Sequence, residues 1–273
     1  MLRKRGEHSG DLKLNGKVAL VTGSTAGIGL AIARSLAREG AHVYVNGRTR
    51  QRVDTAINTI RSSFSGAAVD GIEADFSDPS SARKVTERVP AVDVLVNNVG
   101  IFESKAFSEI PDDDWYRFFE VNVMSGVRLA RYYLASMLEK NWGRILFISS
   151  ESAVQIPAEM VHYGMTKTAQ VAVARGIAES VAGTGVTVNS ILAGPTASEG
   201  VDAFVTGIAM QQNKSRVEVE KEFFQNIRPS SLLKRFATPD EIAAMAVYLA
   251  GEPASATNDA AVRADGGVIR AIL

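Results

Sequence analysis

The 273-residue chain contains no cysteine, and this absence excludes several kinds of chemistry. Disulfide bonds, thiolate metal sites, iron–sulfur clusters and cysteine nucleophiles all require that residue. Histidine is scarce too, because only His8, His42 and His162 occur, far apart in the sequence. An HExxH motif or a multi-histidine site is therefore excluded, and we predict no metal site.

An excess of charge of either sign is also missing. Lys and Arg total 30 and Asp and Glu total 30, which argues against a nucleic-acid-binding protein with its usual basic excess. No apolar run approaches the ~18 residues of a spanning helix, and no apolar segment of a secretory signal follows the basic start. We expect a cytoplasmic protein without nucleic-acid or membrane partners, and a polar tail over residues 1–13.

Short β-branched runs alternate with longer helical patterns along the rest of the chain. Runs such as 92–96 and 145–148 are continuously apolar, which is typical of strands covered on both faces. The alternation predicts one α/β domain over 14–273 with a parallel sheet and right-handed crossovers. We expect strands at 17–21, 42–46, 69–73, 92–97, 144–149, 186–192 and 261–264, and helices at 28–39, 50–63, 79–88, 112–139, 160–181 and 239–250.

Capping residues mark several helix ends. Thr238-Pro239-Asp240-Glu241 forms a capping box with proline in the first helical position, and Asp78-Pro79 indicates a similar start. Gly40 and Gly251 follow helices where a left-handed residue is favoured.

The segment 196–230 interrupts the strand–helix rhythm as a long insertion after a strand. Insertions at the carboxyl ends of such strands are common ligand sites, so we expect a substrate lid here. Its apolar residues, among them Met210 and Phe224, suggest a hydrophobic substrate or simply pack the lid onto the core.

A glycine-rich turn, Thr22 to Gly29, joins the first strand to a helix. Glycines allow a tight turn and close approach of a pyrophosphate, and the helix N-terminus favours an anion. The spacing is GxxxGxG rather than GxGxxG, and a structural strand–helix turn is the alternative. A Walker-type phosphate loop does not fit, because Gly16-Lys17 is followed by Val18.

The second strand ends in Val45-Asn46-Gly47-Arg48, without a carboxylate. An acidic residue there would bind the ribose 2′-hydroxyl of NAD, whereas an arginine accommodates the 2′-phosphate of NADP. Arg48 therefore indicates a preference for NADP(H), with NAD(H) possible, unless it is only a solvated charge.

Tyr163 and Lys167 are one helical turn apart on the same face. A nearby ammonium favours the phenolate, so we expect Lys167, together with a bound cationic nicotinamide and a water-excluded site, to lower the pKa of Tyr163 from its ordinary value near 10. Such a pair is also common on helix surfaces.

Ser150, at the end of the fifth strand, could bond a substrate oxygen beside the tyrosine. A hydrolase serine is disfavoured because no GxSxG motif surrounds it, and His162 is interpreted as structural.

These motifs together resemble those of the short-chain dehydrogenase/reductase family, of the common type of about 250 residues. Thr22 to Gly29 matches its TGxxxGIG loop, and Asn97-Asn98-Val99-Gly100 its NNxG motif. Tyr163 and Lys167 match YxxxK, Ser150 stands 13 positions earlier, and Asn122 matches the asparagine of the tetrad. The resemblance extends from about Leu14 to Gly267.

The resemblance implies a Rossmann-type doubly wound parallel sheet of about seven strands in three layers, and an NAD(P)-dependent enzyme. Tyr163 is then the general acid or base, Lys167 lowers its pKa and holds the nicotinamide ribose, Ser150 orients the substrate oxygen, and Asn122 anchors a water near Lys167. The implied cofactor-binding residues are Gly23, Ser24, Thr25, Gly27, Ile28, Gly29, Arg48, Asp75, Phe76, Asn98, Gly100, Tyr163, Lys167, Gly194, Thr196 and Ser198.

Two positions depart from the family pattern. Ala193-Gly194-Pro195 stands where Pro-Gly is usual, and Asn258-Asp259 where Thr-Gly is frequent before the last strand. The second departure places a charge near a segment often used in tetramer packing.

Two classes of function follow from these observations. The leading hypothesis is an NADP(H)-dependent oxidoreductase that interconverts a small-molecule carbonyl and an alcohol, such as a ketone or 3-oxoacyl reductase, in a homotetramer or homodimer. The alternative is a non-catalytic NAD(P)-binding sensor on the same fold. The intact set of Asn122, Ser150, Tyr163 and Lys167 favours the enzyme. A nucleotide-binding transferase would leave the tyrosine–lysine helix unexplained.

Overall fold

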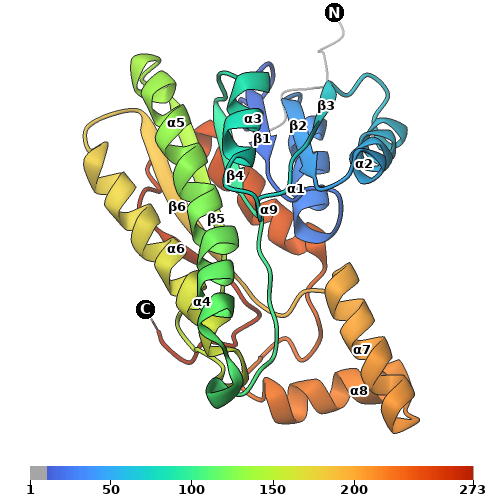
Figure 1. Cartoon of the computed structure of the whole chain (residues 1–273). Helices are drawn as coiled ribbons and strands as arrows, with labels where there is room; N and C mark the ends of the chain where they lie inside the picture. The colour runs from blue at the N-terminus through green and yellow to red at the C-terminus, as the bar shows by residue number, and fades with distance from the viewer. Residues whose placement is uncertain (1–10, 273) are drawn as a thin grey trace, which may run out of the picture.

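Seven parallel strands form the centre of the molecule (Figure 1). The computed structural model describes residues 11–272, so most of the predicted polar tail lies outside the described residues. The strand order is β3-β2-β1-β4-β5-β6-β7, which confirms the predicted parallel sheet. The strands are β1 (Val18–Val21), β2 (His42–Gly47), β3 (Val69–Glu73), β4 (Val94–Asn97), β5 (Gly143–Ser150), β6 (Val186–Ala193) and β7 (Ala261–Ala264).

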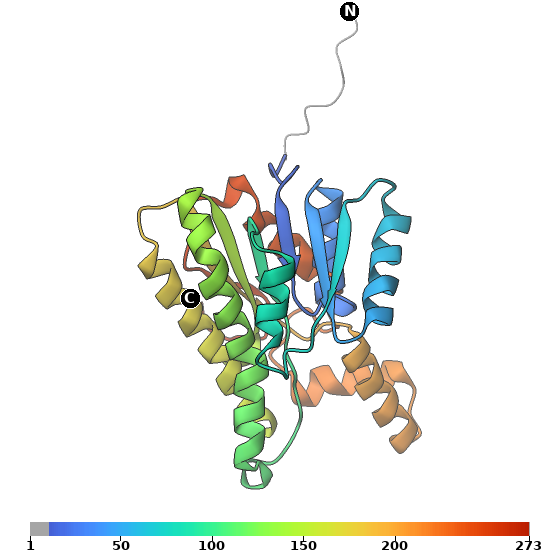
Figure 2. The ribbon, with the colours of Figure 1, turned by 45° about the horizontal axis from the view of Figure 1, so that its top comes forward.

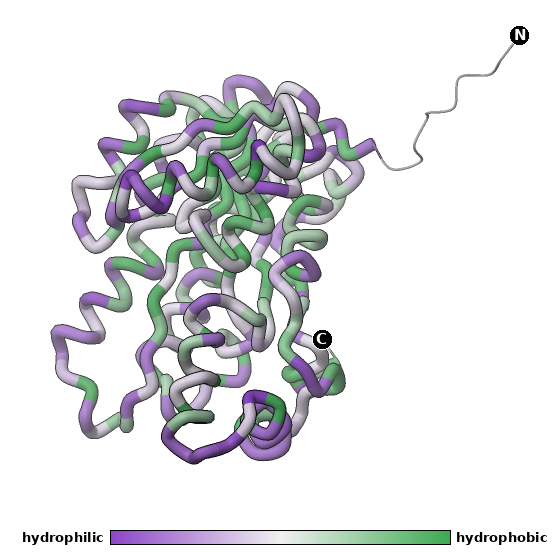
Figure 3. Tube along the Cα trace, turned by 90° about the vertical axis from the view of Figure 1, so that its right-hand side faces the viewer, coloured by the Kyte–Doolittle hydropathy of each residue, from purple (hydrophilic) through white to green (hydrophobic). Residues whose placement is uncertain are grey.

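Helices cover both faces of this sheet in three layers. One core contains apolar residues of α1 (Gly27–Arg38), α2 (Arg50–Ser63) and α9 (Pro239–Ala250). The other contains apolar residues of α3 (Ser81–Arg88), α5 (Ser125–Glu139) and α6 (Val161–Ser180). Because both faces are covered, β5 and β6 are buried along their whole length, polar residues such as Arg144 and Asn189 included. Figure 3 shows this hydrophobic interior, with hydrophilic residues along the outer turns. Among residues 11–272, no helix is long and apolar enough to cross a membrane.

The predicted helix 112–139 is interrupted by a wider turn. It consists of α4 (Asp112–Phe119), a π-helical turn over Glu120–Met124 and α5. A π-helical turn inserts one extra residue, and such turns are frequent at functional sites. Asn122 lies within this turn and is buried.

The insertion after β6 forms α7 (Glu199–Gln212), α8 (Arg216–Glu222) and a π-helical turn (Phe223–Ile227). Figures 1 and 2 show that α4, α7 and α8 extend beyond one end of the sheet, at the bottom of both views. This is the edge at which the parallel strands end. We refer to residues 196–230 as the lid.

The residues predicted to cap helices can be compared with the structure. The Thr238 capping box is present, with Glu241 bonded back to it. The start at Asp78-Pro79 was wrong by two residues, because the Asp78 carboxylate accepts the Ser80 amide and closes a turn before α3 begins. Gly251 is not left-handed: its φ is −84°, and it is needed because Leu12 approaches closely.

Gly40 does adopt the predicted left-handed conformation, with φ +85°, and a Cβ there would lie 2.6 Å from Asn15 Oδ1. We predict that Gly40→Ala lowers the free energy of unfolding by about 1–3 kcal/mol. Gly176→Ala is the matched control, because Gly176 lies inside α6 with no atom within 4 Å of the added Cβ. It should stabilise the protein by about 0.5–1 kcal/mol. Urea unfolding measures both, and equal effects would contradict the account.

Candidate active site

The glycine-rich turn between β1 and α1 is shaped to receive an anion. Gly23 and Gly27 have positive φ angles of 60° and 54°, and a Cβ on Gly29 would lie 2.4 Å from the Gly23 carbonyl oxygen. The first turn of α1 has no side-chain cap and no acidic residue, so its amides face outward with their partial positive charge. Because β1 and β4 are neighbours, this turn lies at the switch point of the sheet, where ligands bind.

Two asparagines hold this turn in place. The buried Asn46 accepts the Gly23 amide at 3.0 Å and donates to backbone carbonyls of β3 and the residues after it. Asn98 Nδ2 donates to the Thr22 and Gly23 carbonyls at 3.0 and 2.9 Å. Asn98, predicted to bind cofactor, thus uses its side chain on the turn itself. Asn46 was missed because its partners are 23 or more residues away in sequence.

The predicted residues around the adenosine end occupy different environments. Arg48 is exposed directly after β2. Asp75 is exposed and accepts the Ser77 amide at 3.0 Å. Thr25 accepts a bond from Arg52, whose guanidinium also pairs with Glu199 at the start of α7. Phe76 is buried in the core under α3, so its side chain is a packing residue.

A cavity of about 420 Å³ lies between the strand ends and the lid. It brings together residues predicted from five separate segments, which are Ile28, Asn98, Gly100, Ser150, Tyr163, Lys167, Gly194, Thr196 and Ser198. The predicted residues that do not line it are Gly23, Ser24, Thr25, Gly27, Gly29, Arg48, Asp75, Phe76 and Asn122. Apolar side chains form much of the remaining wall, including Phe102, Met160, Val201, Phe223, Ile227 and Phe236.

Tyr163 and Lys167 lie on one face of α6, with Lys167 Nζ 5.6 Å from the centre of the tyrosine ring. Burial raises the pKa of Tyr163, the charge of Glu151 raises it further, and a hydrogen bond with Ser150 opposes this. The pKa of Tyr163 is therefore raised in the protein alone, while the expected lowering also involves a bound cationic nicotinamide and stays a prediction. Burial lowers the pKa of Lys167 itself to about 8, because the ammonium is removed from water.

Gln170 links Lys167 to Asn122. Lys167 Nζ donates to the Ile148 carbonyl at 2.9 Å and to Gln170 Oε1 at 3.1 Å. Gln170 Nε2 in turn donates to the Asn122 carbonyl at 2.6 Å. The Asn122 side chain bonds both backbone groups of Ile101. Asn122 is expected to anchor a water that links Lys167 to bulk solvent, and in the structure its carbonyl accepts a bond from Gln170, a residue that the sequence analysis missed.

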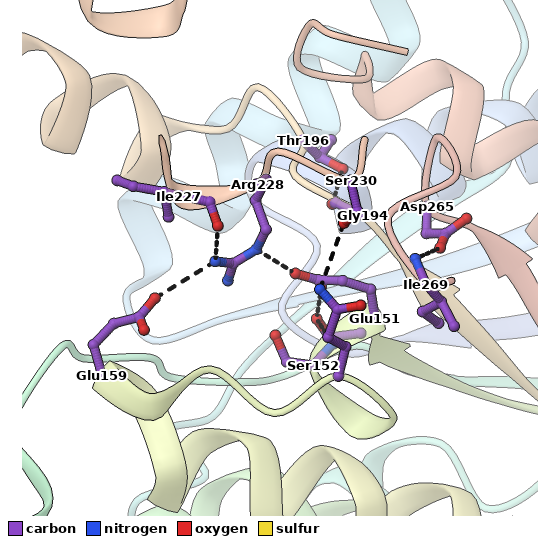
Figure 4. A network of polar contacts seen from close by, with 12 residues as sticks. Glu151, Ser152, Glu159, Gly194, Thr196, Ile227, Arg228, Ser230, Asp265 and Ile269 are labelled. Carbon is purple, nitrogen blue, oxygen red and sulfur yellow. Dashed lines mark hydrogen bonds and ion pairs between the residues drawn. The ribbon is translucent and has the colours of Figure 1, made fainter. Parts of the chain in front are cut away.

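Ser150 is joined to a buried ion pair. Its hydroxyl donates to Glu151 Oε2 and accepts the Ser152 amide at 3.1 Å. Glu151 Oε1 accepts from Arg228 Nε at 3.0 Å, and Arg228 also reaches Glu159 (Figure 4). Glu151 and Arg228 both line the cavity. The sequence analysis predicted neither Glu151 nor Arg228 as a site residue. The position of Glu151 directly after Ser150 could have indicated it.

Local contacts hold both segments that depart from the family pattern. A Cβ on Gly194 would lie 2.5 Å from the Asp265 carbonyl, so glycine is required there, while Pro195 accepts the Ala237 amide through its carbonyl. Asp259 has φ +61°, a conformation that glycine adopts more easily, and its carboxylate pairs with Arg175. His162 is buried against Phe118 and Trp115, outside the cavity lining, in agreement with its interpretation as structural.

Comparison with known proteins identifies the family. The sequence model of the short chain dehydrogenases matches residues 17–218. An oxidoreductase of Bacillus subtilis strain 168, YvaG, is 45% identical over 96% of this chain and 99% of its own. D-beta-hydroxybutyrate dehydrogenase of Cupriavidus necator is 35% identical over 93% and 98%. L-sorbose reductase of Gluconobacter frateurii, solved with NADPH and L-sorbose, has a TM-score of 0.90 at 29% identity over 96% and 100%.

The chain therefore belongs to the short-chain dehydrogenase/reductase family and has its Rossmann-type fold. It is a nicotinamide-dependent oxidoreductase of that family, whose named relatives act on alcohol or carbonyl groups.

The bond from Lys167 to Gln170 stabilises the charged ammonium, so its loss should favour the neutral amine. We predict that Gln170→Leu shifts the pKa of Lys167 clearly below the value of about 8 in the parent protein. Carbon-13 NMR titration of the Lys167 Cε resonance measures this pKa. Gln51→Leu, on the exposed surface of α2, is the matched control and should leave it unchanged. An unaltered pKa in Gln170→Leu would show that this bond contributes nothing to the charge state.

Proposed function

We propose that the protein is an NADPH-dependent carbonyl reductase, with Tyr163 as its proton donor. One observation carries the proposal: Ser150, Tyr163 and Lys167 line a single cavity that begins beside the helix N-terminus of the glycine-rich turn. A binding protein without chemistry needs the turn but has no use for a tyrosine, a serine hydroxyl and a buried ammonium in the adjoining cavity.

The residues at the sheet edge fit a dinucleotide. The outward-facing amides of α1 suit the pyrophosphate, and the left-handed Gly23 and Gly27 leave the backbone open to it. Asp75 would lie toward the adenine, while Gly194, Thr196 and Ser198 would hold the nicotinamide end. Arg48 supports NADP over NAD because a guanidinium suits a 2′-phosphate. A structural neighbour, L-sorbose reductase, was solved with NADPH.

The proton chemistry follows from the environment of each side chain. When bound, the reduced cofactor would supply the hydride that becomes the carbon–hydrogen bond of the alcohol. Tyr163 Oη would give its proton to the carbonyl oxygen, because a phenol with an ordinary pKa near 10 carries its proton at neutral pH. Ser150 would orient the oxygen by turning its hydroxyl proton toward it and away from Glu151 Oε2. Lys167, positioned by Gln170 and the Ile148 carbonyl, would hold the ribose and place positive charge nearby.

The location, oligomeric state and domain extent of the enzyme are inferred from the sequence alone. We retain the expectations of a cytoplasmic location, a homotetramer or homodimer, and a single domain over 14–273 as parts of the proposal. The relatives include a D-beta-hydroxybutyrate dehydrogenase and a 3-oxoacyl-[acyl-carrier-protein] reductase, so the comparisons support carbonyl–alcohol chemistry in general.

Replacing Tyr163 by Phe removes one hydroxyl and the proposed proton donor with it. We predict that Tyr163→Phe reduces turnover of any ketone substrate by at least about 10²-fold, the usual size of a general acid effect. NADPH binding, followed by fluorescence titration, should stay within about twofold. Tyr248→Phe, on the exposed side of α9, is the matched control with full activity. Retained turnover in Tyr163→Phe would refute the assigned role, and NADPH binding without turnover by the parent enzyme would favour a sensor.

Arg48 is expected to make a charge-assisted contact with the 2′-phosphate. Such contacts contribute roughly 1.5–3 kcal/mol, so Arg48→Ala should weaken NADPH binding by about 10- to 100-fold. NADH affinity should hardly change, because NADH lacks that phosphate. Calorimetric titration with both cofactors gives the ratio, and Arg61→Ala, at the far end of α2, serves as control. An unchanged ratio would remove the argument for NADP preference.

A further inference from the structure

The side chain of Glu151 is a buried carboxylate in contact with the groups assigned to catalysis. Only 6% of it is exposed, and it lines the same cavity as Ser150 and Tyr163. Its Oε2 atom accepts the Ser150 hydroxyl, and Ser150 is also hydrogen-bonded to Tyr163. A negative charge is therefore held one polar side chain away from the phenol.

Arg228 of the lid supplies the opposite charge to this carboxylate. Its Nε atom donates to Glu151 Oε1 at 3.0 Å, and its side chain is 12% exposed (Figure 4). Its Nη1 atom donates to the Ile227 carbonyl at 3.1 Å and contacts Glu159 Oε1 at 3.5 Å. The two charges of the pair come from segments 77 residues apart, so the positive one is contributed by the lid.

Two further charges belong to the cavity wall near Tyr163. Lys167 lies on the same face of α6, with its Nζ atom 5.6 Å from the centre of the tyrosine ring. Glu159 shares the guanidinium of Arg228, but 46% of its side chain is exposed. Water and salt screen an exposed charge far more than a buried one, so Glu151 is the carboxylate of this pair with the stronger influence on the phenol.

The remaining titratable groups around this part of α6 compensate one another or face elsewhere. They are His162 of α6, Glu103 and Lys105 of the loop after β4, and Asp114 and Arg117 of α4. Glu103 pairs with Arg117 at 3.0 Å and with Lys105 at 3.5 Å, and Asp114 pairs with the same two cations. The His162 ring lies outside the cavity lining.

A charge near a phenol changes how readily the phenol ionises. A negative charge opposes formation of the phenolate, and a positive charge favours it. Burial raises the pKa of Tyr163, the Glu151 carboxylate raises it further, and the Arg228 guanidinium lowers it. Such effects are larger in a buried site than in water, because the effective dielectric constant is lower there.

We propose that Glu151 and Arg228 act as an opposed charge pair that sets how readily Tyr163 releases its proton. Glu151 keeps the proton on the phenol, and Arg228 limits this effect from the lid. Both are then positioning residues, because neither exchanges a proton with the substrate. The proposal rests on the proposed function, in which Tyr163 is the proton donor, and adds a lid residue to the groups that govern that step.

Titration of the Tyr163 phenol tests the charge pair directly. With NADP⁺ bound and carbon-13 at Cζ of the tyrosines, the NMR resonance of Tyr163 reports its ionisation, and Tyr163→Phe assigns that resonance. Glu151→Gln keeps the shape of the side chain and removes the negative charge, so the pKa of Tyr163 should fall by about one pH unit. Arg228→Met keeps the aliphatic stem and removes the positive charge. It should raise the pKa by a smaller amount, because Arg228 faces the phenol from beyond Glu151.

Three further variants complete the comparison. Lys167 is the same in all of them, so its charge cancels between variants. The double variant Glu151→Gln/Arg228→Met should have a Tyr163 pKa between those of the two single variants. Glu179→Gln, at the end of α6, and Arg83→Met, on α3, remove the same two charges from exposed positions. Both controls should leave the Tyr163 pKa unchanged.

Shifts of opposite sign distinguish the charge pair from a contact that only ties the lid to the core. Shifts in the same direction in the two single variants, or an unchanged pKa in Glu151→Gln, would overturn the proposal. So would a Tyr163 resonance that shows no ionisation below about pH 11 in any variant. Retained ketone reduction in Tyr163→Phe would instead contradict the proposed function, and the titration distinguishes this case because it reads the phenol without turnover.

Discussion

The candidate site depends on the parallel arrangement of the strands. Because β1, β4, β5 and β6 run in the same direction and pair in that order, they end at one edge. The glycine-rich turn, the NNxG segment, Ser150 and the Gly194 region each follow one of these strands. Residues more than a hundred positions apart in sequence therefore meet without any special local structure. The lid extends from the same edge (Figure 2), and several of its residues line the cavity.

Burial of charge is the second constraint at this edge. Lys167 is buried and keeps its ammonium through the Ile148 carbonyl and Gln170, at the cost of a pKa lowered to about 8. Glu151 is buried too, and it is compensated by Arg228 from the lid. A buried charge without a partner is strongly destabilising, so these pairs tie the lid and the π-helical turn to the core.

The fold could be predicted closely because most strands are short runs rich in β-branched residues, and longer helical segments separate them. All seven predicted strands are present, with ends that differ by at most two residues. The break in helix 112–139 could not be predicted, because its apolar periodicity continues through the π-helical turn at Asn122. The helix start predicted at Asp78 was wrong because an aspartate side chain can accept an amide within a turn as readily as it caps a helix.

The site was predicted in its residue types but not in its electrostatics. The spacing of Tyr163 and Lys167 identified the pair, yet spacing alone does not show burial, which raises the tyrosine pKa. The partners Arg228 and Glu151 are 77 residues apart, and only the folded chain brings them together. Gln170 resembles any polar helix residue in sequence. Its two bonds to Lys167 and Asn122 become visible only when the π-helical turn is placed against α6.

Transfer of an isotopic label tests the central claim most directly. The account predicts that NADPH deuterated at the transferable C4 position delivers one deuterium to the carbinol carbon of the alcohol formed from a ketone. Mass spectrometry of the product should show that deuterium in a one-to-one ratio with NADPH consumed. An alcohol product without deuterium would contradict the account. Binding of NADPH without its consumption in the presence of any ketone would contradict it as well.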